Sequence, residues 1–226
     1  MPGPGGVRVV AVPGLGLSVD VPARTLARLR PVAGSAAIAL PGYGEPADRD
    51  TPLDPATLAT LLLARLDRLG AGRVVLLGHS ASCQIVASAA ARAGYRIAAL
   101  VLSGPTTDPR AADWPRLAAR WLRTAAWERP GQVPRLVRDY ARTGLATMAR
   151  AMDAARHGRI DRVLAGVAAP VLVVRGPRDR IVPADWTATL AATAPHGRAV
   201  TLAAGAHMLP LTHPELLAPR IADVLG

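Results

Sequence analysis

The stretch Arg73-Val74-Val75-Leu76-Leu77-Gly78-His79-Ser80-Ala81-Ser82 decides the fold of this 226-residue chain. Four apolar residues in a row are typical of a strand buried on both faces, and the alanine-rich residues 81–92 favour a helix directly after it. Such a sharp turn strains the serine backbone, so its neighbours must be small, and we expect Gly78 and Ser82 to approach each other. The turn also points the Ser80 hydroxyl at a helix start with free N–H groups. The pattern predicts a nucleophile at Ser80.

Two later segments supply the partners that a nucleophilic serine needs. Residues 170–176 are typical of another buried strand, and Asp179 follows them; residues 199–202 indicate a short strand, and His207 follows that. A histidine takes the serine proton, and an acid holds the imidazole in the right tautomer. The chain order, with each residue placed after a strand, predicts a triad of Ser80, Asp179 and His207.

The three motifs together resemble those of the alpha/beta hydrolases, whose nucleophile lies in a Gly-x-Ser-x-Gly turn and whose chain order is serine, acid, histidine. Ser82 stands where that family usually has its second glycine. The resemblance covers nearly the whole length and implies a small capped enzyme of this fold.

Strands and helices alternate along most of the chain, which predicts an α/β fold with a mostly parallel sheet of about six strands flanked by helices. The expected strands begin near Val7, Ala36, Arg73, Arg96, Pro170 and Arg198. Larger members of the family open with an antiparallel hairpin. Because the first predicted strand starts so near Met1, we expect no such hairpin here.

Residues 105–167 break the strand–helix alternation. They contain no strand-like run, and Trp114, Leu117 and Trp121 recur at helical spacing. The resemblance implies that 105–167 form a helical cap or lid, inserted into a hydrolase core made of 1–104 and 168–226. The apolar side chains of this segment either line an acyl pocket or form the cap's own small core. The candidate pocket residues are Trp114, Trp121, Trp127 and Tyr140.

Two Pro-Gly-x-Gly loops compete for a role in binding an oxyanion. Pro13-Gly14-Leu15-Gly16 follows the first strand, where the family usually has His-Gly-x-Gly, so Pro13 replaces a histidine. In the family, the amide of x and the amide after the nucleophile form the oxyanion hole. The resemblance therefore assigns the backbone N–H groups of Leu15 and Ala81. The second loop, 41–44, makes Tyr43 the competing donor, but chain order favours Leu15.

Other side chains are rivals for these roles. His213 is the main alternative base, and Asp108 follows the strand from which some members of the family supply the acid. His79 fits the common Gly-His-Ser form of the turn and is interpreted as a packing residue. Cys83, in the helix after the turn, is expected to be buried.

The chain carries a formal net charge of +11, and all 27 of its basic residues are arginine. A role in binding nucleic acid is disfavoured, because aromatic residues make up only 3% of the chain and no recognition motif is present. Either the arginines reflect a GC-biased genome, or a basic surface attracts an acidic substrate or carrier. Residues 105–167 hold twelve arginines against six acidic residues, so an acidic carrier protein would dock there.

Composition places further limits on the protein. At 226 residues, one domain with a substantial core is expected, and the single Cys83 excludes an intrachain disulfide. The stretch 1–6 has no signal-peptide pattern, and no 18-residue apolar run suggests a membrane span, so we expect a cytoplasmic protein. Neither a Walker-type loop nor a zinc-spaced ligand cluster occurs; no cofactor and no metal are expected.

The resemblance implies hydrolysis of an ester or thioester of a small to medium apolar acyl group, through an acyl-enzyme intermediate. Two alternatives stay open. One is a C–C bond hydrolase of the same fold, and the other is a non-catalytic binding protein that retains it. Pro13 and Ser82, which both depart from the family pattern, keep the second alternative open.

Overall fold

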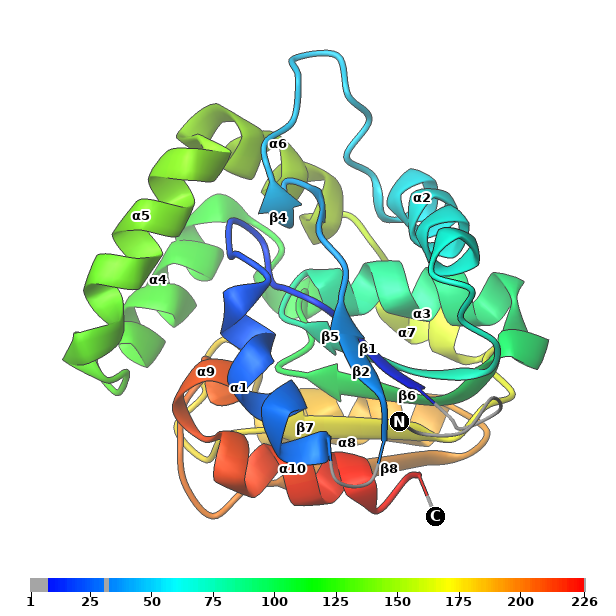
Figure 1. The fold of residues 1–226 in the computed structure, drawn as a ribbon. Coiled ribbons are helices and arrows are strands. Elements are labelled where there is room, and N and C mark those ends of the chain that lie inside the picture. Colours follow the sequence, from blue (N-terminus) through cyan, green and yellow to red (C-terminus); the bar gives the residue numbers. More distant parts are fainter. Residues whose placement is uncertain (1–7, 31–32, 226) are drawn as a thin grey trace.

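The computed structural model describes residues 8–30 and 33–225. Val7, where the first strand was expected to begin, and the stretch 1–6 lie outside these residues. Six strands form one sheet in the order β2-β1-β5-β6-β7-β8, and every neighbouring pair is parallel (Figure 1). The predicted sheet is confirmed, and the described part of it contains no antiparallel hairpin. The strands are β1 (Arg8–Val12), β2 (Ser35–Ala37), β5 (Val74–His79), β6 (Ile97–Ser103), β7 (Val171–Arg175) and β8 (Gly197–Thr201); β3 (Leu40–Pro41) and β4 (Gly44–Glu45) pair separately.

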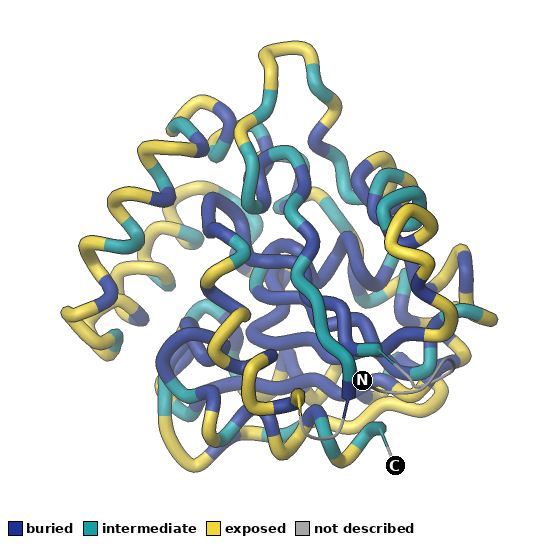
Figure 2. Tube along the Cα trace, in the orientation of Figure 1, coloured by how far each residue is buried: buried dark blue, intermediate teal, exposed yellow. Residues whose placement is uncertain are grey.

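The central strands of the sheet are buried on both faces, because their successive side chains point to opposite sides and each side is covered by helices. Leu76 packs into one core cluster and Leu77 into the other, and both are at most 1% exposed. The first cluster includes side chains of α2 (Pro55–Arg68), α3 (Ser82–Arg92), α7 (Ile160–Leu164) and α8 (Ala184–Thr193). The second includes side chains of α1 (Asp20–Leu29), α9 (Leu209–Thr212) and α10 (Pro214–Ala222). Figure 2 shows the central strands buried between these two layers.

Helix α2 shows how local sequence sets the ends of these elements. The Asp54 carboxylate accepts a hydrogen bond from Thr57 N at 2.9 Å, which satisfies one free amide of the first turn. Pro55 opens the helix with its fixed φ, and Gly70 follows the helix at φ +58°, a backbone region that favours glycine.

The strand order brings several loops to one edge of the sheet. Strand β1 lies between β2 and β5, so the connections after β1 and β5 leave the sheet side by side, at the point where the strand order reverses. The register aligns Val12 with Gly78, His79 with Ser103, and Ser103 with Val174. The loops that begin at 13, 80, 104 and 176 therefore meet at the carboxyl ends of the strands.

The cap segment, defined here as residues 105–167, connects β6 to β7. It contains α4 (Trp114–Ala125), α5 (Val133–Thr143), α6 (Leu145–Arg156) and α7, with the short turns η2 (Pro109–Ala111) and η3 (Pro130–Gln132); η1 (Gly94–Arg96) precedes β6. Figure 1 shows α4 and α5 projecting to one side of the sheet, whereas the α7 side chains join the core cluster of α3 and α8. The division of the chain at 105 and 167 stays a prediction. Among the described residues, no helix is long and apolar enough to span a bilayer.

Candidate active site

The turn between β5 and α3 forces Ser80 into a strained backbone. Its φ is +57°, and it is the one non-glycine residue with positive φ among the residues described. Its N–H donates to Ser103 O at 2.9 Å, which anchors the turn to β6. A Cβ on Gly78 would lie 2.9 Å from Cys83 Cα and 2.6 Å from Val86 Cγ2, so only glycine fits. The backbone that lies against Gly78 is thus that of Cys83, and the contact of Ser82 is with the next residue, His79, whose N–H donates to Ser82 Oγ at 2.9 Å.

Ser80, Asp179 and His207 come together above the carboxyl ends of β5, β7 and β8. His207 Nε2 lies 2.9 Å from Ser80 Oγ, and His207 Nδ1 lies 2.7 Å from Asp179 Oδ2. The other Asp179 oxygen accepts from Ile181 N at 2.9 Å and Val182 N at 3.1 Å. These bonds fix a carboxylate that is fully buried.

Two further residues make this arrangement possible. Arg175, at the end of β7, donates to Asp179 O and Val182 O, both at 2.8 Å, and so shapes the acid loop, residues 176–182, from within. Gly104 has φ +61°, and a Cβ there would lie 3.0 Å from the His207 ring. The absence of a side chain at this glycine leaves room for the imidazole.

The surroundings of His207 favour its charged form. Burial alone would lower the pKa of His207. The charge and the hydrogen bond of Asp179 raise it, as does the negative charge of Glu128, and together they outweigh burial. The pKa of His207 is therefore raised above its ordinary value. A raised pKa makes the imidazole a stronger base and favours the imidazolium that forms when it takes a proton.

His79 does more than pack against its neighbours. Its Nε2 lies 3.1 Å from His207 O, and because a carbonyl only accepts, Nε2 carries the proton. Burial, and then the nearby charge of His207, lower the pKa of His79 to about 3, so the ring is neutral. This neutral donor holds the His207 backbone, a role that sequence interpretation missed because a hydrogen bond between residues 79 and 207 leaves no local pattern.

Ser82 is fully buried, and its hydroxyl forms hydrogen bonds with the backbone. Its Oγ accepts from His79 N at 2.9 Å and lies 3.0 Å from Val12 O and 2.9 Å from His79 O, to one of which it donates. A glycine here could make none of these bonds. The Ser82 hydroxyl therefore lies between the serine turn and the end of β1, directly before the loop that holds Leu15.

The two predicted oxyanion donors have free N–H groups. Within the described part of the chain, neither Leu15 N nor Ala81 N has a hydrogen-bond acceptor. The competing donor is occupied, because Tyr43 N donates to Leu40 O at 2.7 Å. The loop of Leu15 is held in place by Gly16 N, which donates to Gly42 O at 2.8 Å. The free N–H group of Leu15 thus favours it over Tyr43 as the predicted oxyanion donor.

The rival base and acid lie in other hydrogen-bond networks. His213 Nδ1 lies 2.9 Å from Thr212 Oγ1, and its Nε2 lies 3.3 Å from Arg129. Asp108 Oδ2 accepts from Arg110 and Arg120, both at 2.8 Å. Burial alone would raise the pKa of Asp108, but these arginine hydrogen bonds outweigh burial and lower it. Cys83 is buried as expected, and burial raises the pKa of its thiol.

The four candidate pocket residues have different surroundings. Tyr140 packs beside the Leu15 loop: a Cβ on Gly16 would lie 2.9 Å from the Tyr140 ring. Trp127 is half exposed, with the Arg178 guanidinium 4.1 Å from its ring centre, beside the acid loop. Trp121 is 51% exposed. A pocket role for these three stays a prediction.

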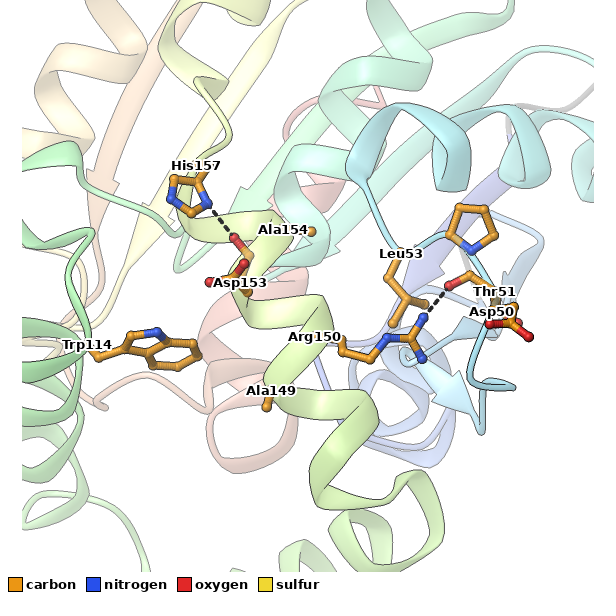
Figure 3. A pocket seen from close by; sticks show the side chains of 10 residues that line it. Asp50, Thr51, Leu53, Trp114, Ala149, Arg150, Asp153, Ala154 and His157 are labelled. Atoms are coloured by element: carbon orange, nitrogen blue, oxygen red, sulfur yellow. Dashed lines mark hydrogen bonds between the residues drawn. The ribbon is translucent and has the colours of Figure 1, made fainter.

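Trp114 lines an open groove of about 600 Å³ beside α6. Figure 3 shows Trp114 on one side of α6 and Leu53 on the other, with Arg150 bonded to Thr51 O. None of the groove's lining residues belongs to the predicted triad. The groove therefore supplies no support for Trp114 as an acyl-pocket residue.

A parallel sheet with a strained serine turn at its carboxyl edge is the architecture of the alpha/beta hydrolases. The sequence matches the alpha/beta hydrolase family over residues 9–220, and the chain belongs to that family. Family and fold together make it a hydrolase. A search of curated proteins finds no match.

Solved structures show the same fold at low sequence identity. A hydrolase from Oleispira antarctica is 15% identical with a TM-score of 0.82, over 99% of this chain and 92% of its own. A hydrolase from Pseudomonas aeruginosa is 22% identical with a TM-score of 0.76, over 98% of this chain and 90% of its own. The enol-lactonase from Burkholderia xenovorans is 18% identical with a TM-score of 0.77, over 100% of this chain and 93% of its own. At these identities the likeness concerns the fold alone.

Proposed function

We propose that the protein hydrolyses an ester or thioester of a small to medium apolar acyl group, through an acyl-enzyme at Ser80. The observation that carries this proposal is a single imidazole, that of His207, within hydrogen-bond distance of both a serine hydroxyl and a buried carboxylate. The Asp179 carboxylate accepts a hydrogen bond from Nδ1–H, which keeps the proton on Nδ1, so Nε2 is the nitrogen that faces Ser80 as a base. A non-catalytic protein would have no need for this arrangement.

In the first half-reaction, His207 Nε2 takes the Ser80 proton while Oγ attacks the acyl carbonyl carbon. The free N–H groups of Leu15 and Ala81 receive the developing oxyanion. When the tetrahedral intermediate collapses, the alcohol or thiol leaves with the proton from His207. Water then attacks the acyl carbon with His207 again as base, the acid is released, and the Ser80 hydroxyl is restored.

The proposed reaction can be tested with a fluorophosphonate probe, which reacts only with an activated serine. We expect a covalent adduct on Ser80, located by peptide mass spectrometry, and no adduct in Ser80→Ala. Ser88→Ala, on α3 but outside the site, is the matched control and should label like the wild type. A well-folded wild type that stays unlabelled would refute the proposal and favour a binding protein that retains the fold.

A substrate panel separates the possible reactions. Aryl esters and thioesters of two to eight carbons should be turned over by the wild type and not by Ser80→Ala. If all of them are inert while a vinylogous diketone is cleaved, the protein is instead a C–C bond hydrolase. The enol-lactonase among the similar structures acts, by its name, on a cyclic ester, which fits the first outcome.

The surface of the cap segment supports a further proposal about the substrate: the acyl group arrives on an acidic carrier protein. Seven of the nine exposed large apolar side chains among the described residues lie between Trp114 and Leu145. The cap segment also has twice as many arginines as acids, twelve against six. Exposed apolar side chains together with an excess of arginines suit a negatively charged partner. With one buried, unpaired cysteine, Cys83, the chain needs no oxidising compartment, and we propose the cytoplasm as its location.

Salt dependence tests the carrier proposal. The kcat/KM for an acyl-carrier substrate should fall as salt is raised, whereas that for the same acyl group on free pantetheine should stay constant. Arg123→Glu on α4 should weaken only the first reaction, and Arg24→Glu, exposed on α1, is the matched control. Equal salt dependence for both substrates would contradict a carrier.

A further inference from the structure

Helix α4 presents a polar side to the catalytic loops. Arg120, Thr124 and Glu128 are spaced by four residues, which places them along one face of a helix and its continuing turn. The turn continues beyond Ala125, because Glu128 N donates to Ala125 O at 3.1 Å. A lid that lined an acyl pocket would turn apolar side chains inward along this face.

The first part of this polar face holds the acid loop. Thr124 is 2% exposed, and its Oγ1 accepts from Arg180 N at 3.0 Å and Ile181 N at 3.1 Å. Arg120 donates to Asp108 at 2.8 Å and to Ile181 O at 3.4 Å. The loop that carries Asp179 is thus bonded to α4 in addition to its own strand.

The second part holds the histidine loop. Glu128 Oε1 accepts from both His207 N at 2.7 Å and Met208 N at 2.8 Å. Its other oxygen accepts from Gln132 Nε2 at 3.0 Å, which fixes the carboxylate. The His207 backbone is therefore held at its N–H by Glu128 and at its C=O by His79. Charge-assisted bonds of this kind are about twice as strong as neutral ones.

We propose that Glu128 is a positioning residue for His207, and that α4 is a fixed part of the catalytic assembly instead of a lid that lifts away. This inference rests on the proposed function, since it assigns Glu128 a role only if His207 is the base. The imidazole must reach Ser80 and Asp179 at once, from a loop between β8 and α9. Glu128 fixes the backbone N–H groups of His207 and Met208, and so the backbone that carries the imidazole.

The charge of Glu128 has a second effect. The titratable groups that face His207 are Asp179 from the acid loop, His79 from β5 and Glu128 from the end of α4. Both carboxylates raise the pKa of His207. Removing the charge of Glu128 should therefore lower the pKa of His207 and move the acid limb of the pH–rate profile to lower pH.

The experiment compares two substitutions of Glu128 with an exposed control on α10, Glu215→Gln, using an aryl ester that the wild type hydrolyses. Glu128→Ala removes both the acceptor and the charge. It should lower kcat about 100-fold with little change in KM, because a small misplacement of a catalytic group costs this much. Glu128→Gln keeps an acceptor oxygen, so it should recover most of kcat while its acid limb still shifts to lower pH. Glu215→Gln should change neither quantity.

An NMR titration of the His207 ring gives a readout that does not require turnover. The ring should titrate at lower pH in Glu128→Gln than in the wild type. If kcat, the acid limb and the ring titration of the Glu128 variants all match the wild type, the positioning role is overturned while the hydrolase stands. If Glu128→Ala does not fold, Glu128→Gln alone decides between these outcomes. A wild type that hydrolyses no ester and takes no fluorophosphonate would instead overturn the proposed function itself.

Discussion

The backbone of Ser80 and the side chain of His79 show that neighbouring residues in one turn can serve different parts of a site. Ser80 accepts a positive φ so that its hydroxyl faces His207. The His79 ring donates instead to the backbone carbonyl of the same histidine. Sequence pattern predicted the first from the strand–serine–helix motif. It could not predict the second, because the partner lies 128 residues away.

The buried His79 makes stability depend on pH. Its pKa is lowered to about 3 in the folded state, whereas an unfolded histidine titrates near about 6.5. Below the unfolded pKa, His79 binds a proton in the unfolded chain but not in the folded one, so stability falls as pH falls. The raised pKa of His207 acts with the opposite sign, so it stabilises the fold at low pH and this gain is lost as pH rises through its raised pKa.

A comparison of variants isolates the contribution of His79. Relative to His79→Gln, the wild type should lose about 1.4 kcal/mol of unfolding free energy per pH unit below 6.5. Urea unfolding at several values between pH 7 and pH 4 measures this difference. The exposed His196→Gln is the control and should track the wild type. Parallel curves for wild type and His79→Gln would show that His79 is not buried in the neutral form.

At the scale of elements, Ser82 joins β1, β5 and α3. Glycine is usual at its position, and sequence analysis predicted only that a serine would be small enough. The structure adds bonds from its hydroxyl to the backbone of His79 and Val12. Which backbone groups the Ser82 hydroxyl contacts depends on how β1 packs beside β5. The spacing of residues in the serine motif does not predict that packing.

Ser82→Ala should destabilise the protein by about 1–3 kcal/mol, because the buried His79 N–H and the buried carbonyl that accepts from the Ser82 hydroxyl each lose a partner. Ser82→Gly, which restores the family's usual residue, should cost at least as much. Urea unfolding at constant pH measures both. Ser88→Ala, on the same helix, should stay within about 0.5 kcal/mol of the wild type. If Ser82→Ala is equally stable, these hydrogen bonds contribute nothing net.

At the scale of the whole molecule, the six strands and their parallel arrangement followed from sequence, and the path of the cap segment did not. Apolar runs identify strands buried on both faces, because each such strand has to be apolar at every position. The inward side of α4 is polar, and Thr124 and Glu128 meet loops that lie 56 and 79 residues further along the chain. Periodicity of apolar residues gave no sign of these polar contacts, because the partners of Thr124 and Glu128 become neighbours only in the folded chain.

The bonds between α4 and the core predict that the cap segment and the sheet unfold together. Three of the four tryptophans, at 114, 121 and 127, lie in the cap segment, and Trp186 is buried in α8. Tryptophan fluorescence and far-ultraviolet circular dichroism should therefore give coincident urea transitions. Trp186→Phe leaves only the three cap tryptophans and should preserve the coincidence. A fluorescence transition at lower urea in that variant would show a cap segment that melts alone.

The polar face of α4 also limits how this enzyme can be altered. Exchanging the insertion between two strands is a direct way to give one fold a new substrate range. In this chain the same exchange would remove Thr124 and Glu128, the anchors of both the aspartate and the histidine loops. A transplanted insertion must bring a hydroxyl and a carboxylate to the same two places. The segment proposed to bind the acyl group thus also holds both catalytic loops, so a mutation there that changes the substrate range is expected to change turnover as well.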